Sequence, residues 1–221
     1  MTTRTPSRST TTDEQLSEEE RAIVEVVRDF VDRKVRPRVR ELEHANTYPE
    51  ALIELMKAIG IYGLAIPEPY GQVKASTPCY ALVAEELSRG WMSLAGAMGG
   101  HTVVAKLLLE FGTEDQQWRY LPRMATGQLR ATMALTEPRG GSDLAHLTTS
   151  ATRDDDGWVI NGAKTWITNA RKSDLIALLC RTARTPLPRT PASASCSSRR
   201  STAPATASPS ERTCRNSATR A

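Results

Sequence analysis

Residues Met133–Asp143 read MALTEPRGGSD and mark the point at which the hydrophobic pattern of the chain changes. Before this segment, apolar residues recur at the three- and four-residue spacing of amphipathic helices. From Leu129 onward, short apolar runs alternate with turn residues, which is typical of β-strands. The pattern therefore predicts an α+β fold, with an all-α N-terminal helical domain followed by an antiparallel β-domain.

The helical part carries recognisable start and stop signals. Ser17–Glu20 and Thr113–Gln116 are capping boxes, in which a hydroxyl and an acid or amide three positions later satisfy each other's backbone N–H groups. Gly60 is placed to end a helix. The small-residue segment Leu94–Gly100 is expected to lead into the helix that begins near Val103. The predicted helices begin at Ser17, Pro49, Thr77, Val103 and Thr113.

The strand pattern is short and ends abruptly. A strand over Lys164–Thr168 would place Trp166 and Thr168 on one face, because side chains alternate along a strand. The strand signal stops after Cys180, so the sheet is expected to be incomplete. Strands are predicted over Leu129–Leu135, Thr148–Arg153, Trp158–Asn161, Lys164–Thr168 and Leu175–Cys180.

The C-terminal segment differs from the rest in composition and charge. From Thr182 to Ala221 the only large aliphatic or aromatic residue is Leu187, too little apolar surface to offset the entropy of ordering. Arg181–Ala221 holds eight arginines and one acid, a charge of +7, whereas the whole chain carries +4. We expect disorder over residues 1–16, a helical domain over 17–127, a partial β-domain over 128–182 and a disordered basic tail over 183–221.

Several classes of protein are disfavoured by composition. The basic tail has no aromatic residues to stack on bases, which argues against nucleic-acid binding. The four cysteines lack metal-ligand spacing, so no metal site is predicted. No apolar run approaches the ~20 residues of a membrane span, and no signal-peptide core follows Met1. The cytoplasm is the expected location, with no membrane partner.

A family resemblance covers roughly residues 17–182. The segments ALTEP (134–138) and GSD (141–143), followed by Asn161-Gly162, Lys164 and WITN (166–169), resemble the two signatures of the acyl-CoA dehydrogenases at the expected separation. Three further blocks match the family in order: IPEPYG (66–71), EELSRG (85–90) and FGTEDQ (111–116). The chain differs at Met133, where an aromatic is common, and at Arg139-Gly140, where a Gly-Ala pair is usual.

The resemblance implies an FAD enzyme that oxidises the Cα–Cβ bond of an acyl-CoA and passes electrons to an electron-transfer flavoprotein. It also implies a homo-oligomer, a dimer or tetramer. Thr136 would hydrogen-bond the pyrimidine side of the flavin. Trp166 would pack against the isoalloxazine ring, and Thr168 would lie toward its N5 atom. Ser142 would serve both the flavin phosphates and the pantetheine arm of the substrate. The implied cofactor-binding residues are Met133, Leu135, Thr136, Gly141, Ser142, Trp166, Ile167 and Thr168.

The family's catalytic carboxylate has no match in this sequence. The resemblance places that glutamate in a C-terminal four-helix domain beyond residue 221, so the 221-residue chain is expected to be truncated and inactive as a dehydrogenase. Glu137 is disfavoured as a base, because it precedes Pro138 in a structural turn. Acyl chain-length preference is not readable, since the pocket is largely built by that domain.

A one-base frame change near Thr182–Pro186 is the favoured explanation of the tail. Residues 192–198 can be written in codons that, one frame over, encode the apolar alternating run Gly-Ile-Ser-Ile-Leu-Leu-Val. Residues 213–221 are also compatible, one frame over, with a second block that is similar to the family. Two alternative functions stay open: a non-catalytic acyl-CoA- or flavin-binding interaction module, and an acyl-CoA oxidase or flavin monooxygenase on the same scaffold.

Overall fold

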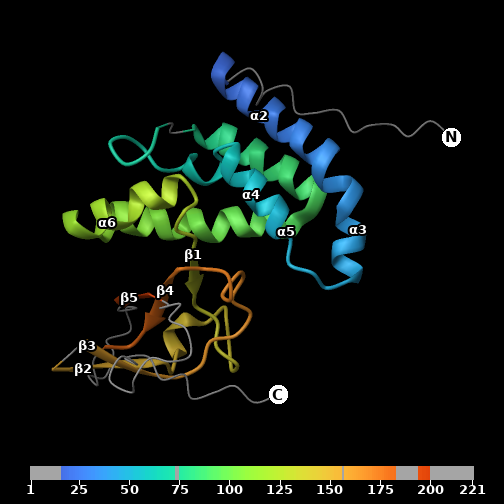
Figure 1. The fold of residues 1–221 in the computed structure, drawn as a ribbon. Coiled ribbons are helices and arrows are strands. Elements are labelled where there is room, and N and C mark those ends of the chain that lie inside the picture. The colour runs from blue at the N-terminus through green and yellow to red at the C-terminus, as the bar shows by residue number, and fades with distance from the viewer. Residues whose placement is uncertain (1–15, 73–74, 156, 183–193, 200–221) are drawn as a thin grey trace, which may run out of the picture. The chain divides into compact units, whose positions relative to one another are not determined.

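A computed structural model describes residues 16–72, 75–155 and 157–182, together with the backbone of Ala194–Arg199. The chain divides into two compact units, a helical unit that runs to Gln128 and a sheet unit that begins at Leu129. The α+β class expected from the change in hydrophobic pattern is confirmed, with the helices first and the strands after them (Figure 1).

The helical unit opens with an almost continuous helix. Helix α2 (Glu18–Phe30) passes through one π-helical segment, η1 (Val31–Val35), into α3 (Arg36–His44) (Figure 1). The predicted capping box is present at its start: the Glu20 N–H donates to Ser17 Oγ at 3.1 Å, and the Ser17 N–H donates to Glu20 Oε2 at 3.1 Å. The second carboxylate oxygen, Glu20 Oε1, accepts the Ser76 N–H at 2.7 Å. One side chain therefore serves the beginnings of two helices.

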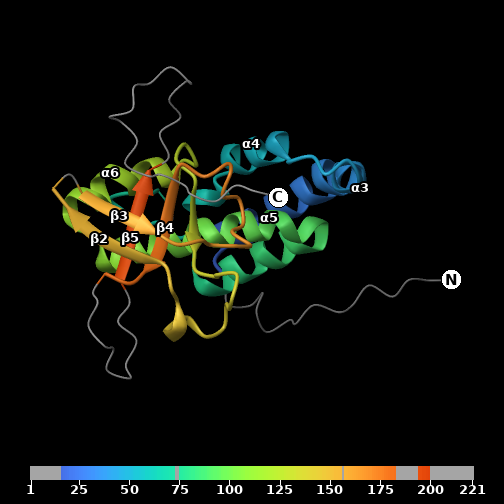
Figure 2. The same cartoon turned by 90° about the horizontal axis from the view of Figure 1, so that it is seen from below.

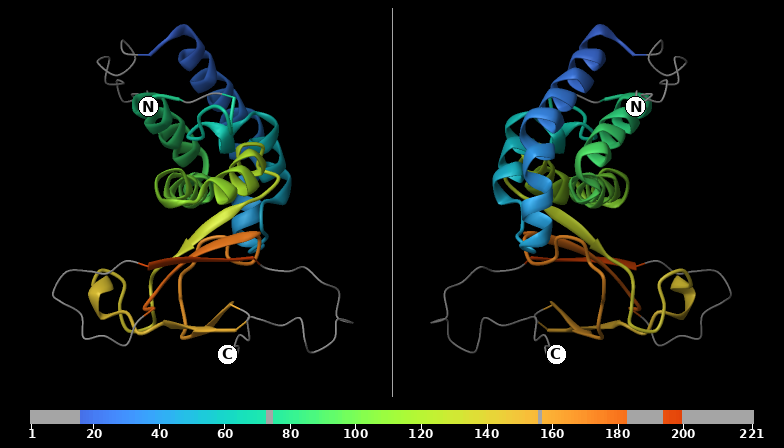
Figure 3. Two further views of the ribbon diagram at one scale, coloured as in Figure 1. Left: turned by 90° about the vertical axis from the view of Figure 1, so that its left-hand side faces the viewer. Right: turned by 90° about the vertical axis from the view of Figure 1, so that its right-hand side faces the viewer.

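Helix α5 (Thr77–Phe111) is bent in its middle (Figure 3). Trp91 has the extended dihedrals φ −161° and ψ 109°, and its Nε1 donates to Glu43 Oε1 at 2.8 Å. Gly90 lets the chain approach η1 closely, since a Cβ there would lie 2.6 Å from Cγ1 of Val31. Leu94–Gly100, expected to precede a separate helix, is itself helical, because its small residues pack within this second half.

The remaining helices are short and agree with their predicted signals. Gly60 has φ 77°, a left-handed conformation that follows the end of α4. The second capping box is also present, with the Gln116 N–H donating to Thr113 Oγ1 at 3.3 Å. These elements are α4 (Glu50–Ala58), η2 (Ile61–Gly63) and α6 (Glu114–Ala125).

Helix α5 forms the centre of the helical core. Leu87, Leu94 and Met98 are almost fully buried along it. By length and composition, α5 is the one helix among the described residues that could cross a bilayer. The break at Trp91 and the stripe of buried side chains instead identify it as the core helix of this unit.

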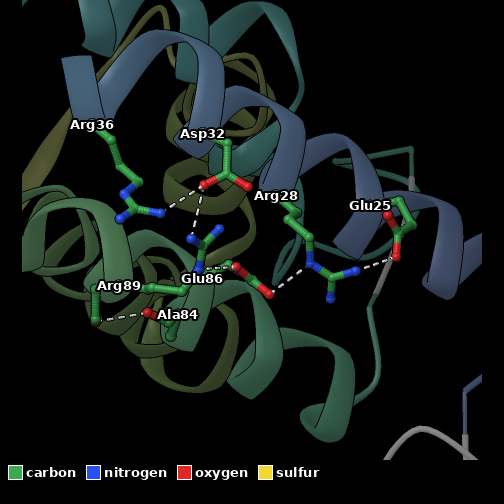
Figure 4. A network of polar contacts seen from close by, with 8 residues as sticks. Glu25, Arg28, Asp32, Arg36, Ala84, Glu86 and Arg89 are labelled. Atoms are coloured by element: carbon green, nitrogen blue, oxygen red, sulfur yellow. Dashed lines mark hydrogen bonds and ion pairs between the residues drawn. The ribbon is translucent and has the colours of Figure 1, made fainter. Parts of the chain in front are cut away.

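An ion-pair network joins α2, η1 and α5 on one side of the unit (Figure 4). Glu86, with a side chain only 8% exposed, accepts from Arg28 Nε at 3.0 Å and from Arg89 Nε at 2.7 Å. Arg89 also donates to Asp32 Oδ1 at 2.8 Å, and this hydrogen bond holds the pKa of Asp32 below its usual range. The network ties together two helices that are distant in sequence.

His101 is a buried neutral base in the same unit, and it predicts a loss of stability in acid. Its Nε2 donates to the Met124 carbonyl at 3.1 Å, and its ring meets that of Tyr62 edge to face. Burial lowers the pKa of His101 from about 6.5 to about 4, against the opposing effect of the Met124 hydrogen bond. The unfolded chain therefore binds a proton that the folded chain does not, and stability falls as the pH drops from about 6.5 toward 4.

We expect a loss of about 2 kcal/mol between pH 7 and pH 5 from this one group. Urea titrations at several pH values, followed by helical circular dichroism, measure the slope. In His101→Gln the same titrations should give a slope smaller by about one bound proton. An unchanged slope in this variant would show that other groups cause the acid sensitivity.

The sheet unit contains two small sheets (Figure 2). Strand β1 (Ala131–Ala134) pairs with β4 (Leu175–Cys180), and Ala131 lies opposite Leu175. Strands β2 (Ser150–Asp154) and β3 (Gly157–Asn161) form a hairpin. The prediction of antiparallel pairing holds for the hairpin and is wrong for β1 and β4, which are parallel. The long connection between β1 and β4 allows the chain to return and run in the same direction.

Strand β5 (Ala194–Arg199) pairs antiparallel with β4, inside the segment for which the sequence predicts disorder. A ladder is made by backbone N–H and C=O groups, so a segment poor in apolar residues can still pair. The rest of the predicted disordered tail, residues 183–193 and 200–221, lies outside the described residues, as do residues 1–15.

The predicted strand over Lys164–Thr168 is wrong. Trp166 has φ 58° and Asn169 has φ 59°, left-handed values that an extended strand excludes. The segment is instead irregular, with a bend at Trp166 and a turn that begins at Thr168. Trp166 and Thr168 therefore do not share a strand face, although both side chains are exposed.

Candidate functional site

The two segments singled out in the sequence lie side by side in the sheet unit. The Thr165 N–H donates to the Thr136 carbonyl at 3.0 Å. Farther along, Thr132 Oγ1 donates to the Thr168 carbonyl at 2.7 Å. Lys164 Nζ closes the other end, donating to the Leu135 carbonyl at 2.7 Å. Three hydrogen bonds thus hold the turn segment 164–168 along β1 and its continuation.

Trp166 lies between these tethers and is 88% exposed. Its left-handed backbone is unfavourable for a residue with a large side chain. Such conformations persist where the surrounding structure fixes them, and they concentrate at functional sites. A large, exposed aromatic ring held by its backbone neighbours is suited to stacking against a flat ligand.

The other predicted site residues lie on or beside the same segments. Gly141 packs against Thr136, since a Cβ at Gly141 would come within 3.1 Å of Thr136 Cγ2. A closed turn precedes Gly141, in which Glu137 and Gly140 exchange N–H···O bonds of 3.0 and 3.1 Å. Ser142 and Thr168 are exposed, whereas Met133, Leu135, Thr136, Gly141 and Ile167 are half-buried.

Glu137 is committed to the structure around it. Its Oε2 accepts from the Thr148 N–H at 2.7 Å and from Thr148 Oγ1 at 2.6 Å. Its Oε1 accepts from the Thr149 N–H at 2.8 Å and from Lys164 Nζ at 3.0 Å. Burial alone would raise the pKa of Glu137, but the hydrogen bonds from Thr148 and Thr149 outweigh it and leave the pKa below its ordinary value. A carboxylate so fully bonded is a poor proton acceptor.

Lys164 lies inside the second signature and is a site residue that the sequence pattern did not predict. Its side chain is 8% exposed and contacts both segments of the site. A lysine set among apolar and hydroxyl residues is a signal in itself, because buried lysines require a partner. Among the described residues, no group of three or more His, Cys, Asp or Glu side chains is arranged to hold a metal ion.

The arrangement of these two segments defines a class of site. They carry an exposed indole, hydroxyls and half-buried apolar side chains, and hydrogen bonds join them. This combination offers one stacking wall and several hydrogen-bond groups, as a planar heteroaromatic cofactor requires.

Comparison with known sequences places the chain in a family. The sequence model described as "Acyl-CoA dehydrogenase, N-terminal domain" matches residues 17–128. The model described as "Acyl-CoA dehydrogenase, middle domain" matches residues 132–200. The chain belongs to the acyl-CoA dehydrogenase family.

Individual relatives and solved structures agree with this assignment. A (2S)-methylsuccinyl-CoA dehydrogenase of Cereibacter sphaeroides is 38% identical over 76% of this chain and 31% of its own length. A glutaryl-CoA dehydrogenase of Mycobacterium smegmatis, solved in complex with FADH2, has 31% identity and a TM-score of 0.71, over 77% of this chain and 44% of its own. A structure described as the electron transferring flavoprotein of Acidaminococcus fermentans has 29% identity and a TM-score of 0.71. The match covers 75% of this chain and 44% of that one. The chain spans less than half the length of the curated relatives it matches.

Proposed function

We propose that this chain contributes the flavin-facing part of an FAD-dependent acyl-CoA dehydrogenase, which oxidises the Cα–Cβ bond of an acyl-CoA thioester. The observation that carries the proposal is the hydrogen-bonded contact between segments 132–137 and 164–168, which holds the exposed Trp166 in place. The FADH2 complex of the glutaryl-CoA dehydrogenase, and the acyl-CoA substrates named for the relatives, support the same reading.

The residues present fit an isoalloxazine ring. Trp166 supplies a stacking surface, and the hydroxyls of Thr136 and Thr168 supply hydrogen-bond partners on the adjacent segments. We also assign Met133, Leu135, Gly141 and Ile167 to the flavin ring, and Ser142 to the flavin phosphates and the pantetheine arm. When bound, FAD supplies the acceptor for the hydride that leaves the β-carbon. The chain's own residues bind the ring and orient it.

Removal of the α-proton requires a carboxylate, and we assign none among the described residues. Glu137 adjoins the site, but its two oxygens already accept four hydrogen bonds. Its role is therefore structural. We further propose that an electron-transfer flavoprotein accepts the electrons, that the protein is a cytoplasmic homo-oligomer, and that acyl chain-length preference is set by residues other than those described.

Binding of FAD by the purified 221-residue chain tests the proposal directly. We expect the chain to quench flavin fluorescence on titration, and Trp166→Ala to weaken FAD binding about tenfold through loss of ring stacking. Trp158→Ala is the matched control, since Trp158 is a second exposed indole in the sheet unit, on β3. Equal FAD affinity of Trp166→Ala and the parent chain, or no binding by the parent, would contradict the proposal.

A further inference from the structure

A buried ion pair lies where the two site segments meet. Lys164 and Glu137 are 3.0 Å apart, with side chains only 8% and 6% exposed. Burying two charges costs much of what their attraction returns, so such a pair adds little net stability. The position of the pair between the two site segments therefore points to a role other than stability.

Most hydrogen bonds of the pair are made with backbone groups of neighbouring segments. Lys164 reaches the Leu135 carbonyl at 2.7 Å, one residue before Thr136. Glu137 holds the N–H groups of Thr148 and Thr149, so the carboxylate is itself immobile. The ammonium is therefore held from two directions, by a fixed carboxylate and by a carbonyl at the end of β1.

The left-handed turn at Trp166 needs such an anchor. Only Thr165 separates Lys164 from Trp166, and the Thr165 N–H is bonded to the Thr136 carbonyl. Because the indole is 88% exposed, burial of its ring contributes little to fixing φ at 58°. The constraint comes from the hydrogen bonds on either side, with Lys164 Nζ at one end and the Thr132–Thr168 bond at the other.

We propose that Glu137 and Lys164 are positioning residues, which fix the segment carrying Trp166 and Thr168 in the conformation that receives the flavin ring. The proposal rests on the proposed function for its purpose, but the positioning is a property of the chain without flavin. Neither residue is catalytic, because each acts through the backbone of its neighbours.

The test compares Lys164→Met with Lys172→Met, an exposed lysine in the same unit, in the full chain without FAD. The indole N–H resonance of Trp166, assigned with Trp166→Phe in indole-labelled protein, reports the position of the ring. The exchange rate of the Thr165 amide reports the bond to Thr136. In Lys164→Met we expect the Trp166 resonance to shift, the Trp158 resonance to stay, and the Thr165 amide to exchange at least about tenfold faster.

The double variant Glu137→Gln/Lys164→Met separates positioning from stability. The variant carries neither an unpaired carboxylate nor an unpaired ammonium, but the glutamine NH2 opposes a backbone N–H of Thr148 or Thr149. Its thermal midpoint is therefore measured beside that of Lys164→Met, to show that the compared chains are folded. The Leu135 carbonyl still lacks its donor, so the Trp166 resonance should remain displaced and FAD affinity should stay about tenfold reduced. This variant also serves if Lys164→Met alone fails to fold.

An unshifted Trp166 resonance in a folded Lys164→Met or double variant overturns the proposal. So does a displacement equally large in Lys172→Met. If the parent chain binds no FAD, the proposed function fails, whereas the resonance and exchange measurements still decide the positioning role. The two hypotheses are thus tested by different signals.

Discussion

Replacing Gly162 by alanine is expected to destabilise the sheet unit by about 4 kcal/mol. Gly162 follows β3 with φ 148°, a conformation that residues with a Cβ rarely adopt. An added Cβ would lie 2.6 Å from Thr149 Oγ1 and 2.7 Å from Thr149 Cα. Since Thr149 is 1% exposed and its main chain is bonded to Glu137, it has little room to move. The cost of the backbone strain at position 162 therefore adds to the cost of the overlap between the new Cβ and Thr149.

Two other glycines separate these contributions. Gly157 has a similar φ of 152°, but a Cβ there meets nothing within 4 Å, so Gly157→Ala should cost only the backbone strain, about 1 kcal/mol. Gly140 has open space and no left-handed φ, so Gly140→Ala should be nearly neutral. Amide hydrogen exchange in β2 and β3 measures the loss of stability in all three alanine variants. Equal losses in Gly162→Ala and Gly157→Ala would show that the contact with Thr149 is not the cause.

Replacing Glu86 by glutamine should cost the helical unit about 3 kcal/mol. The carboxylate is the only group in the network that accepts from both Arg28 and Arg89. A neutral amide can accept from one guanidinium but presents its NH2 to the Nε–H of the other. That arginine then keeps only its second carboxylate, which is Glu25 for Arg28 and Asp32 for Arg89. The arginines are 26% and 37% exposed, so solvent moderates the loss below that of a fully buried pair.

The neighbouring residue supplies the control. Glu85 precedes Glu86 on α5 and is exposed, so Glu85→Gln changes the net charge equally without breaking the network. We expect this variant to stay within about 0.5 kcal/mol of the parent chain. Thermal unfolding followed by helical circular dichroism compares the two. If both variants lose the same stability, the change in net charge is responsible and the network is not.

Local signals in the sequence predicted the helical unit well. Ser17 and Thr113 head capping boxes that the structure contains, and Gly60 ends its helix in a left-handed conformation. Each of these features depends on residues within four positions of one another. The bend at Trp91 was not predicted, because it depends on Gly90 meeting Val31 of a distant helix.

The sheet unit was predicted less accurately for the same reason. The alternating pattern located β1 to β4, but it contains no information on which strands pair, and the parallel pairing of β1 with β4 was missed. In Lys164–Thr168 the apolar content suggested a strand, whereas tertiary hydrogen bonds hold an irregular segment that bends at Trp166. The roles assigned to Thr136, Ser142, Trp166 and Thr168 stay predictions. The structure adds how segments 132–137 and 164–168 are joined.

The parallel pairing of β1 with β4 has a consequence for the order in which the chain folds. Ala131 pairs with Leu175, 44 positions later, whereas Asp154 and Gly157 close the β2–β3 hairpin across a few residues. Closing the longer loop costs roughly 2 kcal/mol more in chain entropy. The hairpin should therefore form within microseconds, and the β1–β4 ladder only later. During synthesis β1 emerges first and waits without its partner, so its exposed edge is the point at which a nascent chain is open to chaperones or to self-association.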